Sequence, residues 1–340
     1  MNSRAFITGV SGLELTDAER EFVRAERPWG FILFKRNVDT PAQVARLVGE
    51  MRDCVEDPEA PVLIDQEGGR VQRLGPPHWP VYPPGAVFGA LYDSDRALGL
   101  KAARLSSRLI AADLMDVGIT VDCLPLADVP VEGCDAVIGN RAYGTEPAKV
   151  AAIARAVTEG LEQGGVLPVL KHIPGHGRAA ADSHFRLPTV DTSKEELERT
   201  DFAAFQPLAD LPMAMTAHVV FSALDPAHPA TTSATIIRQV IRGAIGFQGL
   251  LMSDDVSMNA LAGSIAERTR AIVNAGCDMV LHCNGKLDEM RDVARETPEL
   301  AGEALDRARR ALASRRKPAP FDRQAARAEL EALMDRVATA

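Results

Sequence analysis

The 340-residue sequence predicts an α/β protein, a single (β/α)8 TIM barrel with a C-terminal helical appendage. Short apolar runs alternate with amphipathic helical stretches along the chain. Each run has about five residues rich in Val, Ile and Leu, as expected for parallel strands buried on both faces. Eight such strands, each followed by a helix, can close into a barrel. The runs are Arg4–Gly9, Gly30–Phe34, Pro61–Asp65, Thr120–Leu124, Val166–Lys171, Met213–His218, Gly249–Asp254 and Asp278–His282.

Helix-start signals lie between these runs. They are Thr16-Asp-Ala-Glu19 and Ser193-Lys-Glu-Glu196, which have the form of capping boxes, Thr40 before Pro41, and Ser233 ahead of the stretch toward Ile245. The alternative is an open doubly wound sheet, which would place a G-x-G-x-x-G after the first strand. Gly9-Val-Ser-Gly12 is too loose a match to bind a dinucleotide.

Two helical stretches, about 298–315 and 321–338, follow the eighth run with no further strand. We therefore expect one domain over residues 1–340, with the barrel at about 1–295 and the helical appendage at about 296–340. No low-complexity linker or internal repeat marks a second domain.

Composition narrows the function classes. Apolar residues make up 46% and charged residues 25%, typical of a globular protein, and the net charge of −9 argues against a nucleic-acid partner. The five cysteines are scattered without a C-x-x-C pair, which favours a reducing compartment over a disulfide framework. The N-terminal residues have no apolar signal-peptide segment, and no stretch could span a bilayer. We expect a cytoplasmic protein with no membrane partner.

Polar side chains follow the predicted strands where each strand ends. The third run ends in Asp65-Gln-Glu-Gly-Gly-Arg70, the fifth in Lys171-His172, the sixth in His218 and the seventh in Ser253-Asp254-Asp255. The carboxyl ends of barrel strands meet on one face, where catalytic groups of such barrels lie. The recurrence therefore predicts an active site at this face rather than core packing. Adjacent carboxylates on a strand point in opposite directions, so one of Asp254 and Asp255 should face a substrate.

The segment after the fifth run, Ile173 to Asp191, is long for a strand-to-helix connection, a feature of functional loops. It contains Asp182-Ser-His184. An aspartate that accepts a hydrogen bond from one imidazole nitrogen leaves the other free and raises its basicity, which suits proton transfer near neutral pH.

Two other chemistries fit some of these residues. A hydrolytic zinc site could use His172, His176, Asp182, His184 and His218, although no H-E-x-x-H or H-x-H motif is present. Lys171 could form a Schiff base as in an aldolase, although that requires a neutral amine in an apolar pocket. We expect no metal and no organic cofactor.

Four blocks of sequence resemble glycoside hydrolase family three β-N-acetylglucosaminidases, in the same order, and the similarity runs from about residue 5 to 290. The blocks are Ile64-Asp-Gln-Glu-Gly-Gly-Arg-Val-Gln-Arg73, Ile138-Gly-Asn-Arg141 with Tyr143-Gly144, Lys171-His-Ile-Pro-Gly-His-Gly177 followed by Asp182-Ser-His184, and Gly249-Leu-Leu-Met-Ser-Asp-Asp255. The closest resemblance is to the single-domain bacterial enzymes of cell-wall recycling. It implies removal of N-acetylglucosamine from 1,6-anhydro-N-acetylmuramic acid and its peptides, so the expected partner is a small carbohydrate.

Residue by residue, the resemblance implies Asp254 as nucleophile, His184 as acid/base and Asp182 as its orienting partner. It further implies that the sugar beside the cleaved bond is held by Asp65, Arg73, Arg141, Lys171 and His172. A phosphorylase is an alternative, because a neutral imidazole base adds no negative charge near an incoming phosphate. A non-catalytic sugar sensor would be expected to lack the nucleophile or the dyad, and both are present. This chain departs from the pattern at Arg178-Ala-Ala-Ala181, and its oligomeric state is not readable from these residues.

Overall fold

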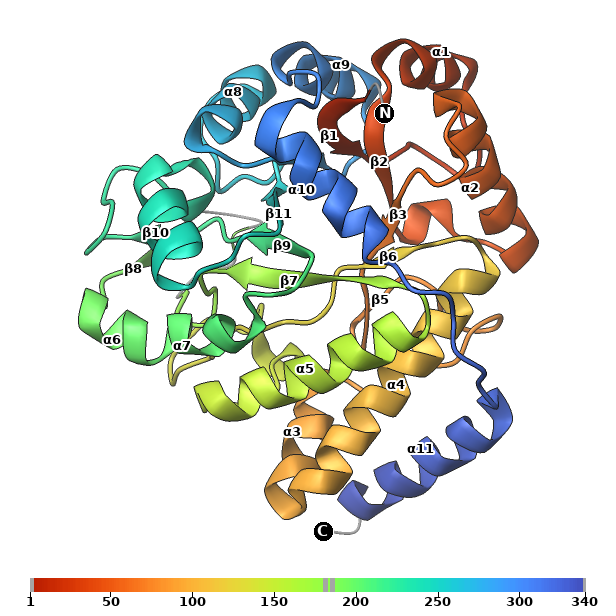
Figure 1. Ribbon diagram of the computed structural model, residues 1–340, viewed down its shortest axis with the longest axis vertical. Coiled ribbons are helices and arrows are strands. Elements are labelled where there is room, and N and C mark those ends of the chain that lie inside the picture. The colour runs from red at the N-terminus through yellow and green to blue at the C-terminus, as the bar shows by residue number, and fades with distance from the viewer. Residues whose placement is uncertain (1–2, 180–182, 184–186, 339–340) are drawn as a thin grey trace.

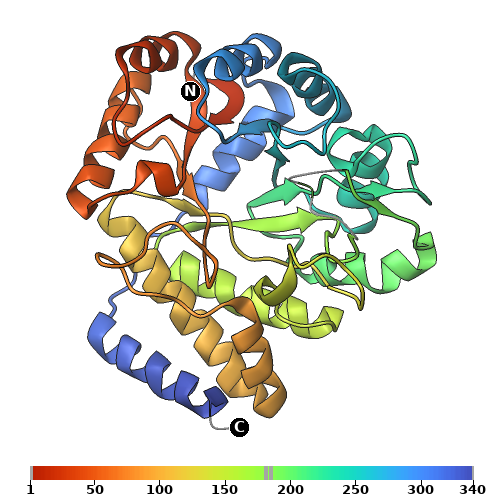
Figure 2. The ribbon, with the colours of Figure 1, turned by 180° about the vertical axis from the view of Figure 1, so that it is seen from behind.

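The computed structural model describes residues 3–179, 183 and 187–338, without the side chains of 337 and 338. Eight parallel strands close into a barrel in the order β1-β12-β11-β9-β7-β6-β3-β2 (Figures 1 and 2), so the predicted (β/α)8 fold is confirmed. Each predicted run overlaps one strand. The strands are β1 (Arg4–Thr8), β2 (Pro28–Leu33), β3 (Val62–Ile64), β6 (Val121–Asp122), β7 (Leu167–Ile173), β9 (Met213–Thr216), β11 (Leu250–Asp255) and β12 (Met279–His282). Strand β2 begins two residues before its run, and β7 and β11 end two residues and one residue beyond theirs.

Helices surround the barrel. They are α1 (Asp17–Glu26), α2 (Pro41–Val55), α3 (Gly85–Ser94), α4 (Arg96–Asp116), α5 (Pro147–Gln163), α6 (Lys194–Arg199), α7 (Asp201–Phe205), the π-helix η5 (Ile236–Ala244), α8 (Ile265–Ala275) and α9 (Leu287–Glu296). The capping box of Thr16 and Glu19 forms as predicted. Ser193 accepts from the Glu196 N–H at 3.3 Å, but the Glu196 carboxylate binds Arg178 instead of completing the box.

Helix α10 (Gly302–Ala313) closes the N-terminal end of the barrel, while α11 (Arg323–Ala338) lies along α3 and α4 (Figure 1). Ala308 and Ala311 of α10 are buried in a core cluster with inward-facing strand residues such as Trp29 and Val121. The segment before α10 binds the start of β1, since the Leu300 N–H donates to the Ser3 carbonyl at 2.8 Å. With this end closed, a polar cavity inside the barrel can open only at the C-terminal end of the strands.

A small hairpin that periodicity did not predict follows β3 and shapes that open end. Its strands are β4 (Gln66–Gly68) and β5 (Val71–Gln72). The Gln66 side-chain oxygen accepts from the backbone N–H groups of Arg73 and Leu74, both at 2.9 Å. The backbone N–H of Gln66 donates to the carboxylate of Asp122 in β6 at 3.0 Å. Gly68 has φ +94°, and a Cβ there would lie 2.4 Å from the Pro83 carbonyl oxygen. The hairpin therefore holds the residues that flank it, Asp65 and Arg73, at the open end of the barrel.

A second unpredicted feature is a two-stranded parallel sheet of β8 (Thr189–Val190) and β10 (Val220–Phe221), which joins the loops after β7 and β9. Of the helices that the structure describes, none has both the length and the apolar character needed to cross a bilayer.

The packing of α10 predicts an effect on stability. Ala308→Leu would insert three carbon atoms where the side chain is fully buried, and overpacking of this kind costs about 1–3 kcal/mol. Ala313→Leu adds the same atoms at an exposed position of the same helix and should change stability little. Urea unfolding of both variants tests this. Equal midpoints would show that α10 does not pack tightly against the barrel.

Candidate active site

A cavity of about 270 Å³ lies at the C-terminal end of the barrel, where polar residues were predicted to gather. Side chains within or after β2, β3, β6, β7, β9, β11 and β12 line it. All of the predicted site residues that the structure describes are among them: Asp65, Arg73, Arg141, Lys171, His172 and Asp254. The remaining two, Asp182 and His184, lie outside the described residues.

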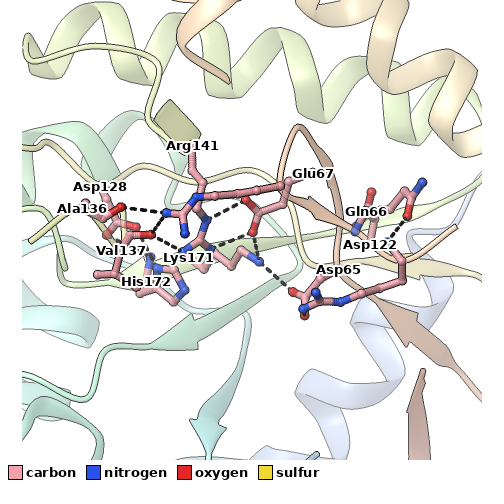
Figure 3. Close-up of polar contacts among 12 residues, drawn as sticks. Asp65, Gln66, Glu67, Asp122, Asp128, Ala136, Val137, Arg141, Lys171 and His172 are labelled. Atoms are coloured by element: carbon pink, nitrogen blue, oxygen red, sulfur yellow. Dashed lines mark hydrogen bonds and ion pairs between the residues drawn. The ribbon is translucent and has the colours of Figure 1, made fainter. Parts of the chain in front are cut away.

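Five charged side chains form a continuous series of ion pairs beside the cavity, and Figure 3 shows four of them, Asp65, Lys171, Glu67 and Arg141. Asp65 accepts from Arg73 Nη2 at 3.0 Å through Oδ2 and from Lys171 Nζ at 2.9 Å through Oδ1. Lys171 Nζ also lies 2.7 Å from Glu67 Oε1. Arg141 then binds Glu67 with two parallel bonds, from Nε and Nη2, each 2.8 Å. We call this series, Arg73–Asp65–Lys171–Glu67–Arg141, the charge chain.

The charge chain keeps its members ionised. Burial alone would raise the pKa of Asp65, but the charges of Lys171 and Arg73 outweigh burial and hold it well below its ordinary value. Burial opposes ionisation of Glu67 too, yet Arg141 and Lys171 hold its pKa at about 2. Burial would lower the pKa of Lys171, whereas Asp65 and Glu67 raise it above its usual range. The two carboxylates beside Lys171 favour its ammonium form, which argues against the aldolase alternative because a Schiff-base nucleophile is a neutral amine.

A second polar cluster surrounds Asp128, which lies in the segment after β6. Its carboxylate is 2.7 Å from His172 Nδ1 and accepts from the backbone N–H of His176 at 2.7 Å. Burial would raise its pKa, but the two histidines outweigh burial and hold it at about 2. Asp128 therefore fixes both the ring of His172 and the start of the loop after β7.

His176 connects this cluster to the loop that contains the predicted acid/base pair. Its Nε2 lies 3.0 Å from Ser183 Oγ, and both residues line the cavity and are buried. Burial and neighbouring His172 lower the pKa of His176 to about 4, against the raising effects of Asp128 and Asp254. His176 is therefore neutral near pH 7. Ser183 stands between Asp182 and His184 in the sequence. Because those two residues lie outside the described part of the chain, their assignment as the acid/base pair stays a prediction.

Two adjacent carboxylates end β11 and differ in their partners. The Asp255 carboxylate accepts from Ser257 Oγ at 2.6 Å and from the backbone N–H groups of Ser257 and Cys283 at 3.0 and 3.1 Å. The Asp254 carboxylate accepts from the Asp255 N–H at 2.8 Å, and the Asp254 N–H donates to Thr216 Oγ1 at 3.3 Å. Asp255 is thus occupied in closing a turn, although both carboxylates belong to residues that line the cavity.

The histidines considered as zinc ligands have other partners where the structure describes them. His218 lies 2.8 Å from Thr231 Oγ1 through Nδ1 and 2.9 Å from the Asp255 carbonyl through Nε2. Within residues 3–179, 183 and 187–338, no group of three or more His, Cys, Asp and Glu side chains is arranged to hold a metal ion.

Glu67, Asp128 and Arg178 are residues of the site region that the sequence analysis did not select. Glu67 was inside a motif that was already quoted, while Asp128 follows β6 in an irregular segment with no periodic signal. Arg178, at the departure from the family pattern, binds buried Asp201 at 2.6 Å through Nε and Glu196 at 3.1 Å through Nη2. It therefore attaches the loop after β7 to α6 and α7.

Known proteins resemble this chain over most of its length. A family model described as "Glycosyl hydrolase family 3 N terminal domain" matches residues 7–314. The β-hexosaminidase of Chromobacterium violaceum is 39% identical over 81% of this chain and 77% of that protein. The β-hexosaminidase of Neisseria meningitidis serogroup A is 39% identical over 86% of this chain and 82% of that protein. The crystal structure of NagZ from Neisseria gonorrhoeae in complex with N-trifluoroacetyl-D-glucosamine is similar with a TM-score of 0.86 and 31% identity, covering 100% of this chain and 98% of that one.

The low pKa of His176 predicts acid sensitivity. The unfolded chain takes up this proton near pH 6.5, whereas the folded chain does so only near pH 4. Stability from this residue is therefore complete above pH 6.5 and is lost as the pH falls toward 4, with a loss of about 2 kcal/mol at pH 5. The carboxylates of the charge chain add to the loss only at lower pH, because their ordinary pKa values are 3.8 and 4.5.

Urea unfolding at about pH 7.5 and about pH 5 measures the effect. His176→Gln should lose less stability between the two pH values than the wild type, and His78→Gln, at an exposed histidine, should behave as the wild type. The comparison uses the change with pH, so a general destabilisation by the glutamine does not affect it. Identical losses in all three proteins would contradict the burial of a neutral His176.

Proposed function

The chain belongs to glycosyl hydrolase family 3, and we propose that it is a retaining β-N-acetylglucosaminidase that removes terminal β-linked N-acetylglucosamine. The observation that carries this proposal is one cavity that is lined by Asp254 and by four members of the charge chain, Asp65, Arg73, Arg141 and Lys171. Its volume of about 270 Å³ lies just below the usual range for drug-sized ligands and suits a single sugar residue.

The charge chain supplies the polar contacts that a sugar requires. Lys171 and Arg141 can donate to hydroxyl and acetamido oxygens, and Asp65 can accept from hydroxyl groups. Apolar side chains of the same cavity, Met215, Met258 and Leu281, offer surface to the acetyl methyl group and the sugar ring. Arg73 and His172 also line the cavity, and we assign them to the binding of the same sugar residue.

For the reaction, Asp254 attacks the anomeric carbon and forms a glycosyl-aspartate, while the protonated His184 donates to the leaving oxygen. Water then replaces the aspartate after His184 removes its proton, with Asp182 orienting the imidazole. Support for these roles comes from the match to the family motif and from Ser183, which lines the same cavity as Asp254. Phosphate in place of water would make the enzyme a phosphorylase.

The natural substrate of the proposal is a cell-wall fragment, N-acetylglucosaminyl-1,6-anhydro-N-acetylmuramic acid or its peptides, cleaved in the cytoplasm. All five cysteines are unpaired, which fits a reducing compartment.

The first prediction of the proposal concerns Asp254. Release of p-nitrophenol from p-nitrophenyl β-N-acetylglucosaminide should exceed release from the β-glucoside, and Asp254→Asn should lower kcat by at least about a thousandfold because the covalent step is lost. Asp255→Asn is the matched control, with a fall of no more than about tenfold, because its donors can still bind an amide oxygen. Equal losses in the two variants would contradict Asp254 as nucleophile. Added phosphate that yields a sugar-1-phosphate would assign a phosphorylase.

The second prediction concerns His184. His184→Gly should lower kcat/KM for the natural disaccharide by about 10²–10⁴-fold, because its leaving alkoxide needs a proton. The loss should be much smaller for p-nitrophenyl β-N-acetylglucosaminide, whose leaving group is stable as an anion. Parallel assays on the two substrates decide the point. Equal losses would exclude His184 as the general acid.

A further inference from the structure

We propose that Glu67 is a positioning residue that fixes the two donors Lys171 and Arg141 from behind the cavity and sets its charge so that it accepts a neutral sugar and rejects small anions. This inference rests on the proposed function. Glu67 is buried, with 4% of its side chain exposed, and it is not among the described residues that line the cavity. It therefore acts through other residues, because Lys171 and Arg141 lie between it and a bound sugar.

The effect of Glu67 on Lys171 is to hold the position of its ammonium group. An ammonium group has three N–H donors. In Lys171 one of them donates to Asp65 Oδ1 at 2.9 Å, and the ammonium nitrogen also forms an ion pair with Glu67 Oε1 at 2.7 Å. These two carboxylates come from β3's carboxyl end and from β4, so together they hold the ammonium group between two separate elements. Lys171 also lines the cavity, so a bound sugar meets an ammonium group whose position is already fixed.

The effect of Glu67 on Arg141 is to hold the plane of its guanidinium. The two parallel bonds from Nε and Nη2 use the geometry in which Arg binds carboxylates most specifically. Nη1 donates to the Val137 carbonyl at 3.1 Å, which holds the opposite side of the group. The N–H groups that remain on Nη1 and Nη2 are therefore presented to the cavity without rotational freedom, and a sugar that binds them does not have to order the side chain.

Glu67 also sets the charge of this wall. The charge chain alternates three cations with two anions, and Glu67 is the carboxylate that Lys171 and Arg141 share. Removing its charge would leave these two buried cations with only Asp65 as a partner in the chain. A buried excess cation attracts any small anion that can reach it. Glu67 therefore prevents inorganic anions from occupying the sugar position.

Two variants separate charge from geometry. Glu67→Gln keeps the length and shape of the side chain but removes its charge, whereas Glu67→Asp keeps the charge but shortens the reach. Asp278→Asn is the matched control: Asp278 is also 4% exposed and also binds two cations, Arg242 at 2.8 Å and Arg307 at 2.9 Å. It directly precedes β12 at the opposite end of the barrel, so it shares the burial and pairing of Glu67 without its place beside the cavity.

The measurements are kcat and KM for p-nitrophenyl β-N-acetylglucosaminide, and inhibition by sodium sulfate at constant ionic strength. Glu67→Gln should raise KM at least about tenfold and become competitively inhibited by sulfate, while the wild type is not. Glu67→Asp should raise KM without gaining sulfate inhibition. Asp278→Asn should lose stability in urea unfolding, because Arg242 and Arg307 lose a charged partner, but should keep the KM and sulfate insensitivity of the wild type.

The proposal is overturned if Glu67→Gln is folded and has the KM and sulfate response of the wild type, or if Asp278→Asn shows the same changes. Should Glu67→Gln not fold, Glu67→Asp decides, since an unchanged KM in that variant contradicts the positioning role. A wild type that cleaves no hexosaminide would instead contradict the proposed function. Calorimetric titration of sulfate and of N-acetylglucosamine into both Glu67 variants would then still decide the role of Glu67.

Discussion

The constraint on which this site depends is the alternation of five charges at the barrel mouth, of which Glu67 and Lys171 are buried and the other three are only partly exposed. Taking one such charge out of water costs several kcal/mol, and only close partners on each side offset that cost. The charge chain meets this condition because its members come from different elements: Asp65 and Glu67 from β3's end and β4, Arg141 from the loop after β6, and Lys171 from β7. The strand order brings these elements together, since β3, β6 and β7 are neighbours in the barrel. Because α10 packs against the other end of the barrel, these charges gather at the open end. The strand order places the charges side by side, and their pairing in turn holds the ends of these elements together.

Sequence reasoning found the barrel because each strand is a short apolar run that ends at a polar residue, and that pattern is local. It found Asp65, Lys171 and Asp254 for the same reason, and motif resemblance added Arg73 and Arg141. It did not find Glu67 or Asp128, because their importance lies in partners 74 and 44 positions away. The β4–β5 hairpin was also missed, since a strand of two or three residues has no readable periodicity. Long-range pairing of buried charges follows from the closed sheet and not from any window of sequence.

The loop after β7 is attached by polar contacts in its first described part and at Ser183. Asp128 binds the His176 backbone, His176 contacts Ser183, and Arg178 binds Asp201. Arg178 belongs to the stretch where the sequence departs from the family pattern, so this chain has its own anchor at that point. A neutral His176 suits the contact with Ser183, because an imidazolium there would lie beside His172 without a carboxylate at Nε2. The ion pair of Arg178 with Asp201 and the contact of the neutral His176 with Ser183 both hold this loop, and neither adds a charge to the cavity lining.

The charge inventory gives a physical reason for an imidazole as the proposed acid. Asp65, Asp254 and Asp255 line the cavity, and Glu67 and Asp128 lie in contact with its lining residues. A further carboxylic acid among these groups would have its ionised form destabilised by each neighbouring carboxylate. It would release its proton readily only if a cation were added beside it, and the cations of the wall are already paired with Asp65 and Glu67. An imidazole is cationic before it donates and neutral afterwards, so the carboxylates stabilise its protonated form. In a cavity built on anions that hold sugar-binding cations in place, histidine supplies the proton with less electrostatic conflict than a carboxylic acid would.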